Sequence, residues 1–175
     1  MGNSAAVAET FLGMHEVHAV LATAVLAAVI ACWGILSQRA LACRQATLDM
    51  ITASEADRQL IDARLTFIRL AKENGGLAVW AEPQNEATVE SQAIRLVLNQ
   101  FELAAIGISR KILDYQLYVR WCGSSAQKTW EHADPYVRLL RQRQGRNTYF
   151  GEFESLIERL KTDPPRHRNK SPNKP

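Results

Sequence analysis

The sequence predicts an all-α protein: a single N-terminal transmembrane helix followed by an irregular cytoplasmic helical bundle. Residues 17–38 contain no Asp, Glu, Lys or Arg, although these residues make up 22% of the chain. Downstream, apolar residues recur at spacings of three and four, and no run alternates for long as a strand would. We divide the chain into a short flank (1–16), a transmembrane helix (17–38), a helical domain (39–161) and a disordered, basic, Pro-rich tail (162–175).

The apolar segment 18–36 matches a membrane span in length, because a helix rises about 1.5 Å per residue and the hydrocarbon layer is ~30 Å thick. Trp33 fits an interfacial anchor near its end. A cleaved signal peptide would need a basic region before the apolar run, which is absent. Val29-Ile30-Ala31-Cys32 resembles a lipoprotein signal, but apolar residues continue to Leu36. A buried core helix rarely lacks polar residues on every face. A retained span is therefore favoured.

The charge distribution predicts the orientation of this span. Residues 1–38 carry only Glu9 and Glu16, whereas residues 39–175 carry all 21 Lys and Arg against 16 acids. Arg39 and Arg44 follow the C-terminal end of the span, so the positive-inside rule places the N-terminus outside and the helical domain in the cytoplasm. The expected location is the inner (cell) membrane, and the lipid bilayer is the first expected partner.

Helix boundaries downstream follow from caps and breakers. Ser54 looks like an N-cap because acids follow it in the first turn. The stripe after it ends at Asn74-Gly75-Gly76 and consists of Ala56, Leu60, Ala63, Phe67 and Leu70. A short loop with Pro83 leads into the longest amphipathic run, which holds Ile94, Val97, Leu98, Phe101, Ala105, Ile108 and Ile112 and continues towards Trp121.

Three further segments complete the domain. Gly123-Ser124-Ser125 is expected to end the long run, and Trp130 falls in a short helical piece. Asp134-Pro135 reads as an N-cap with Pro at the first helical position of a helix that ends at Gly145. The last helix carries Tyr149, Phe153, Leu156 and Leu160 on one side.

Six polar residues on the apolar helices form the candidate site. Polar groups near a core must find partners, so we expect a network made of Asn99, Glu102, Asp114, Arg138, Arg141 and Glu154. Pairing of Glu102 with Arg141, or of Glu154 with Arg138, is the simplest guess. One interpretation is an active-site cluster with a perturbed carboxylate. The favoured interpretation is a buried network that fixes how the helices dock, because no nucleophile or acid–base pair accompanies it. The catalytic residues are thus unknown.

Other candidate binding residues are weaker. The tail could contact anionic lipid through Arg166, Arg168, Lys170 and Lys174, although a plain solubilising tail is favoured. His15 and His18 lack a carboxylate partner, and the odd count of three cysteines has no CxxC spacing, so neither metal nor cofactor is expected. A basic cluster lacks any nucleic-acid motif, so no specific nucleic acid is expected; it holds Arg138, Arg141, Arg143 and Arg146.

The order of short motifs resembles the DUF4760 family, a domain of unknown function found in bacteria and their phages. The motifs, in order, are Thr47-Leu48-Asp49, Leu98-Asn99-x-Phe101-Glu102, Ala105-Ile106-Gly107-Ile108, Leu113-Asp114, Leu117-Tyr118, Pro135-Tyr136-Val137 with Arg141, and Tyr149 with Phe153-Glu154-x-Leu156. The likeness covers roughly residues 15–161. It implies a membrane-anchored helical domain with no established activity. The acidic N-terminal flank and the long basic tail depart from the pattern.

These observations favour a non-catalytic, membrane-tethered module that binds a protein partner of unknown identity, with a phage-related role at the envelope as one concrete version. The alternative is a membrane-localised hydrolase that uses Glu102, Asp114 and Arg141, which requires those side chains to converge on an accessible pocket. A third hypothesis is homo-oligomerisation through small residues of the span, namely Ala24, Ala27, Ala28 and Ala31.

Overall fold

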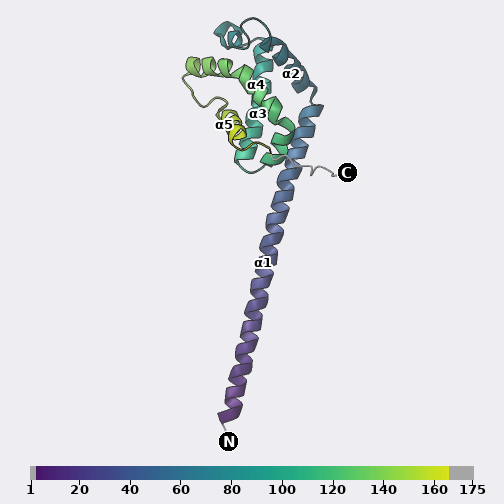
Figure 1. Ribbon diagram of the computed structural model, residues 1–175, viewed down its shortest axis with the longest axis vertical. Coiled ribbons are helices and arrows are strands. Elements are labelled where there is room, and N and C mark those ends of the chain that lie inside the picture. Colours follow the sequence, from purple (N-terminus) through teal and green to yellow (C-terminus); the bar gives the residue numbers. More distant parts are fainter. Residues whose placement is uncertain (1–2, 166–175) are drawn as a thin grey trace, which may run out of the picture. The chain divides into compact units, whose positions relative to one another are not determined.

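The computed structural model describes residues 3–165, with side chains from residue 23 onward (Figure 1). Its elements are α1 (Asn3–Ala56), α2 (Arg58–Ala71), two short 3-10 helices, η1 (Ala78–Ala81) and η2 (Pro83–Asn85), then α3 (Val89–Ser109), α4 (Tyr115–Gln144) and α5 (Gly151–Thr162). No strand occurs in the described part of the chain. The all-α prediction is confirmed.

The chain divides into two units, Met1–Ala42 and Cys43–Pro175. The first unit is the N-terminal part of α1. Its apolar side chains from residue 25 to residue 36 are exposed, and Trp33 is 75% exposed. Among the described residues, one helical stretch, Thr23–Ala56, is long and apolar enough to cross a membrane. The last turns of α1, from Cys43 onward, belong to the second unit together with α2 to α5.

The boundary between α1 and α2 lies three residues later than the sequence suggests. Ser54 lies inside α1 and donates its hydroxyl to the carbonyl of Met50 at 2.8 Å, a bond that competes with capping. Asp57 is the N-cap instead: it has extended backbone angles and accepts a hydrogen bond from the Leu60 N–H at 3.2 Å. The Ser54 prediction was therefore wrong.

The long amphipathic run does not continue to Trp121. Helix α3 ends at Ser109, Lys111 adopts a positive φ of 57°, and the N–H of Leu113 returns to the carbonyl of Gly107 at 3.0 Å. This turn leaves Ile112 exposed and buries Leu113. The spacing of apolar residues gave no sign of this turn, because Ile112 and Leu113 are as apolar as the residues before them.

Helix α4 is one helix of 30 residues, where the sequence predicted three segments. It passes through both expected breaks, Gly123-Ser124-Ser125 and Asp134-Pro135. Its buried residues nevertheless form one continuous stripe, from Tyr118 to Leu140. Asp134 pairs with Arg138 one turn later instead of capping a helix. Tertiary packing along the stripe therefore overrides the local helix breakers.

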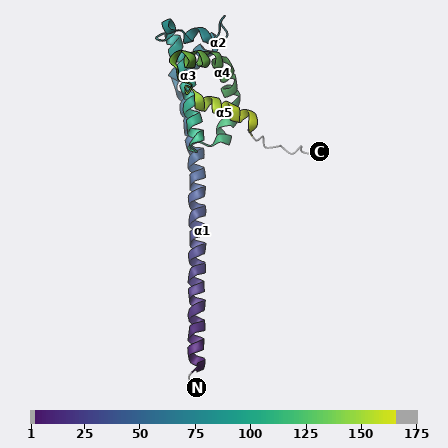
Figure 2. The same cartoon turned by 90° about the vertical axis from the view of Figure 1, so that its left-hand side faces the viewer.

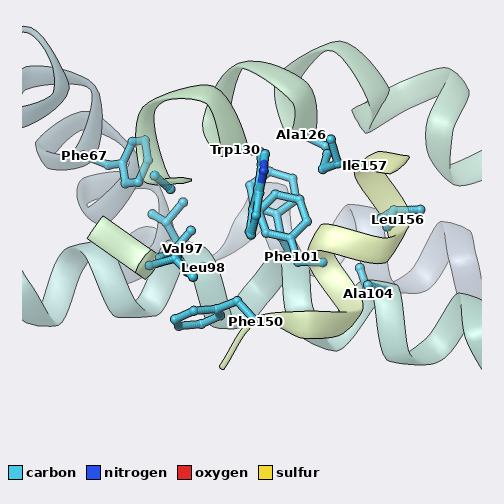
Figure 3. Close-up of a cluster of buried hydrophobic side chains, with 14 of the residues drawn as sticks. Phe67, Val97, Leu98, Phe101, Ala104, Ala126, Trp130, Phe150, Leu156 and Ile157 are labelled. Atoms are coloured by element: carbon cyan, nitrogen blue, oxygen red, sulfur yellow. The ribbon is translucent and has the colours of Figure 1, made fainter. Parts of the chain in front are cut away.

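Helix α3 lies at the centre of the domain, against α2 and α5 (Figures 1 and 2). Phe153 of α5 is fully buried between Phe101 of α3 and Trp130 of α4. It stacks on the Phe101 ring with 4.8 Å between centroids and meets the edge of the Trp130 ring at 5.2 Å. Figure 3 shows Phe101 and Trp130 inside this cluster. The predicted stripes of α2, α3 and α5 supply most of the core. The exceptions are Ala56 at the end of α1 and Ile112 after α3, which are exposed, and Tyr149, which precedes α5 and is half-buried.

Two buried glycines should respond oppositely to substitution by alanine. A Cβ at Gly107 would lie 2.6 Å from Cδ1 and 2.8 Å from Cγ of Leu113, so Gly107→Ala is expected to destabilise the domain by about 1 kcal/mol net. A Cβ at Gly123 would meet Leu160 and Val119 at 3.6 Å, an ordinary contact, so Gly123→Ala should stabilise it by about 0.5–1 kcal/mol. Urea unfolding of both variants measures the difference, and equal effects would contradict it.

Candidate functional site

The N-terminus of α5 has no cap of its own. Its N-cap residue is Phe150, which adopts a left-handed backbone conformation (φ 55°) and offers no side-chain hydrogen bond. Glu102 of α3 supplies the missing acceptors: its two carboxylate oxygens accept from the N–H groups of Phe153 at 2.7 Å and Glu152 at 3.3 Å. An anionic acceptor at a helix N-terminus is favoured by the helix dipole. Glu102 therefore docks α5 onto α3.

Arg141 of α4 holds the same end of α5. Its Nη1 donates to the Glu154 carboxylate at 2.8 Å, and its Nε and Nη2 donate to the Tyr149 carbonyl at 2.9 and 2.7 Å. The side chain is only 15% exposed. The guessed pairings were wrong, since Glu102 binds backbone N–H groups and Glu154 pairs with Arg141. A sequence shows which charges are present but not which backbone groups a fold leaves without partners.

The remaining network candidates lie elsewhere. Arg138 is 74% exposed and pairs with Asp134 at 2.8 Å, which raises the pKa of the guanidinium. Asn99 is exposed on α3 and lines a shallow polar groove between α2 and α3 with Asp62 and Arg95. The six candidates therefore form separate local contacts, and only Glu102, Arg141 and Glu154 meet, around the start of α5.

Asp114 joins the end of α1 to the turn before α4. It is the N-cap of α4, accepting from the Leu117 N–H at 2.9 Å, and it pairs with Arg44 at 3.5 Å. Its own N–H donates to the hydroxyl of the fully buried Thr47 at 2.8 Å, and that hydroxyl donates to the Cys43 carbonyl at 2.7 Å. Thr47 was not among the predicted site residues, because a threonine inside a helical run carries no sign of burial.

The basic cluster is largely taken up by internal contacts. Besides Arg138 and Arg141, Arg143 donates to the Ala81 carbonyl and to the Glu86 carboxylate, so it ties α4 to the segment before α3. Arg146 is exposed beyond the end of α4. Arg141 and Arg143 therefore tie α4 to other segments, whereas Arg138 pairs within its own helix.

Two sets of predicted residues belong to the ends of the chain. Arg166, Arg168, Lys170 and Lys174 lie outside the described residues, as do the side chains of His15 and His18. Helix α5 ends at Thr162, one residue into the segment assigned to the tail, and the Asp163 carbonyl accepts a hydrogen bond from Tyr115. Within the described side chains, no group of three or more His, Cys, Asp or Glu is arranged to hold a metal ion.

An apolar groove lies between the last turns of α1 and the start of α4. It has a volume of about 540 Å³ and is lined mainly by Leu48, Ile51, Leu117 and Trp121. Trp121 is 66% exposed and Leu48 is 46% exposed. The sequence suggested no separate role for Trp121, because this residue lies at the expected end of the long apolar run. Exposed aromatic residues of this kind are enriched at protein interfaces.

Cys122 lies beside this groove and is expected to react slowly. Burial raises the pKa of its thiol, and burial likewise raises the pKa of the neighbouring Tyr118 phenol. In a Cys32→Ser/Cys43→Ser chain, alkylation by iodoacetamide at pH 8 should be several-fold slower than in urea and should still rise between pH 8 and pH 10, because little thiolate is present below the raised pKa. A rate already constant by pH 8 would contradict this prediction.

Comparison with known proteins places the chain in a family. No curated protein and no solved structure matches it. The model of the family described as "Domain of unknown function (DUF4760)" matches residues 21–160, which include most of the apolar part of α1, all of α2, α3 and α4, and α5 as far as Leu160. The chain therefore belongs to the DUF4760 family.

Proposed function

We propose that this protein is a single-pass membrane protein whose helical domain, spanning about residues 39–161, lies in the cytoplasm and acts by binding a protein partner. The observation that carries the proposal is the exposed apolar surface of α1. The large side chains of this surface are more than half exposed, namely Val25, Leu26, Val29, Ile30, Trp33, Ile35 and Leu36. Apolar surface of this extent is unfavourable in water, and a bilayer removes it from water.

The orientation rests on charge. Arg39 and Arg44 are the first basic residues after the apolar stretch, and Glu9 and Glu16 are the only charged residues before it. Positive charge flanking a span is retained on the cytoplasmic side. The C-terminal domain then faces the cytoplasm and the short N-terminal flank lies outside.

Binding is favoured over catalysis because the three residues that a hydrolase would use, Glu102, Asp114 and Arg141, already have partners within the domain. Asp114 precedes α4 and Arg141 lies near its other end, about 40 Å away at 1.5 Å per residue. They therefore cannot act on one substrate group. Glu102 caps α5, and Arg141 pairs with Glu154. The hydrolase alternative required Glu102, Asp114 and Arg141 to converge, so it has lost its basis. The exposed Trp121 groove supports a binding role instead.

Membrane topology is the first test. The full chain, carrying a C-terminal green fluorescent protein or alkaline phosphatase, is expressed in bacterial cells, and membranes are washed with alkaline carbonate. We expect a carbonate-resistant chain, bright fluorescence and an inactive phosphatase, because phosphatase folds only outside the cytoplasm. Release by carbonate would overturn the membrane anchor, and an active phosphatase would overturn the orientation.

A narrower form of this proposal places the module at the bacterial inner membrane during phage infection. It is supported by the phage-linked family that the motif order resembles. Cells with and without the gene would be challenged with a panel of phages, with membrane location verified in parallel. A change in plaquing is expected for at least one phage, and unchanged plaquing across the panel would remove this version while leaving the anchored module intact.

A further inference from the structure

The apolar groove beside Trp121 is one end of a longer surface channel that follows α4. Three hollows share residues along it: Ile51, Glu55 and Trp121 border the first and second, and Ser125 borders the second and third. Helix α4 forms one wall throughout, from Leu117 to His132. The opposite wall is the end of α1, then part of α3 at Gln100 and Phe101, and then the C-terminal end of α2. We call this continuous surface the α4 groove. All of its residues lie in the second unit.

The first end of the α4 groove is apolar. Leu48 and Ile51 face Leu117 and Trp121 across it, and its volume is about 540 Å³. The one carboxylate at this end, Glu55, is already paired with Arg64 at 2.9 Å. This end therefore offers area for apolar anchors and no free charge to attract a basic partner.

The middle of the groove is narrow. It holds about 110 Å³ between Ser54 and Gln100 on one side and Tyr118 and Cys122 on the other. The amide of Gln100 donates to the Ser54 hydroxyl, so these polar groups are mutually satisfied. Only small side chains of an occupant fit at this point.

The far end is basic. Lys72, the C-cap residue of α2, lines a hollow of about 540 Å³ together with Lys128 and His132 of α4. Ser124, Ser125 and Thr129 of α4 line the same hollow. Its floor is apolar, formed by Phe67, Ile68 and Ala71, and no acidic residue lines it. Two lysines that share a hollow without a carboxylate favour an acidic group on the occupant.

We propose that the α4 groove binds an amphipathic helix of a protein partner, with apolar residues at spacings of three and four against Trp121 and carboxylates at the end that meets Lys72 and Lys128. This inference rests on the proposed binding function and names the chemistry of its partner. The groove runs about 22 Å along α4, which equals about four turns of a second helix. Its walls remain too exposed to enclose a small molecule, whereas a helix laid in a groove needs only one covered face.

Peptide selection on the full-length chain tests the proposal. The chain is held in phosphatidylcholine nanodiscs, and a displayed library of helix-forming peptides of about 18 residues is selected on it. We expect the enriched peptides to carry apolar residues at helical spacing and carboxylates clustered at one end. Trp121→Ser should weaken their binding about 30-fold, the effect of losing one interface hot spot. Lys72→Glu/Lys128→Glu should instead select peptides with basic residues at that end.

Matched substitutions outside the groove separate binding from folding. Leu103→Ser changes a residue of α3 that is 61% exposed, and Arg146→Glu/Lys161→Glu makes the same charge change elsewhere on the domain. Both should retain wild-type affinity, and circular dichroism should show all four variants folded. No enrichment above empty nanodiscs, or equal binding to all variants, would overturn the inference.

Two further outcomes are decisive. If vesicles of phosphatidylglycerol, but not of phosphatidylcholine, compete with the peptides, the basic end of the groove binds a lipid surface. That result would overturn the proposal of a helical protein partner. A carbonate-resistant chain that selects no peptide would overturn this inference alone, whereas a chain released by carbonate would overturn the membrane anchor of the proposed function, whatever peptides it selects.

Discussion

Phe153→Ala is expected to destabilise the helical domain by about 3–5 kcal/mol, the range for removing a fully buried aromatic ring. The ring lies between Phe101 and Trp130, at 4.8 and 5.2 Å between centroids, so its loss removes two aromatic contacts together with the buried area. Because these three rings come from α5, α3 and α4, the cavity would open where all three helices meet. Total stabilities of single domains are about 5–15 kcal/mol, so partial unfolding at 37 °C should follow.

Urea unfolding of the detergent-solubilised chain, followed by near-ultraviolet circular dichroism, measures this effect. Phe153→Leu keeps most of the volume and should cost about 1–2 kcal/mol. Leu103→Ala, on the exposed side of α3, should change stability by less than about 0.5 kcal/mol. If Phe153→Ala were as mild as Leu103→Ala, α5 would not pack on α3 and α4 as described.

Arg141→Met should destabilise the domain by about 2–3 kcal/mol. The substitution removes the ion pair with Glu154 and both hydrogen bonds to the Tyr149 carbonyl, and hydrogen bonds to charged groups contribute about 1.5–3 kcal/mol. Glu154 is 36% exposed, so water can solvate its carboxylate after the substitution, which limits the loss.

Arg138→Met is the matched control for Arg141→Met. It lies three residues away on the same helix and also forms an ion pair, but its side chain is 74% exposed. Exposed pairs contribute about 0–1 kcal/mol, so this variant should remain close to wild type. If both variants lost the same free energy of unfolding, Arg141 would stabilise the domain only through its positive charge and not through its contacts with α5.

Much of the fold could be predicted from apolar spacing. The buried faces of α2 and α3 follow the predicted stripes, and the buried side of α5 includes Phe153, Leu156 and Leu160 as expected. Predictions of where helices end were less accurate. Gly123 and Pro135 weaken a helix locally, yet the continuous buried stripe of α4 keeps it intact. Conversely, the turn after Ser109 contains apolar residues that mimic a continuing helix. Both errors arise because local signals are weak relative to tertiary packing.

The candidate polar residues could be named from the sequence, but their partners could not. Glu102 binds N–H groups at the start of α5, which have no acceptor within the helix and receive none from the N-cap residue, because Phe150 has no polar side-chain atom. Thr47 serves the turn before α4, 67 residues away in the chain, through a backbone hydrogen bond. Trp121 continued an apolar pattern, and only the fold shows that its ring is exposed. Long-range contacts of these kinds have no signature in a single sequence.

The placement of Phe153 has a consequence for synthesis of the chain. Translation proceeds from the N-terminus, so the apolar stretch of α1 leaves the ribosome first and α5 leaves last. Until α5 has emerged, Phe101 and Trp130 lack the ring that covers them, and the N-terminus of α5 cannot yet receive its cap from Glu102. The nascent chain therefore presents part of the apolar face of α3 from the time that α3 emerges until α5 follows it. Chains that stop short of α5 thus expose a surface on which chaperones and proteases act.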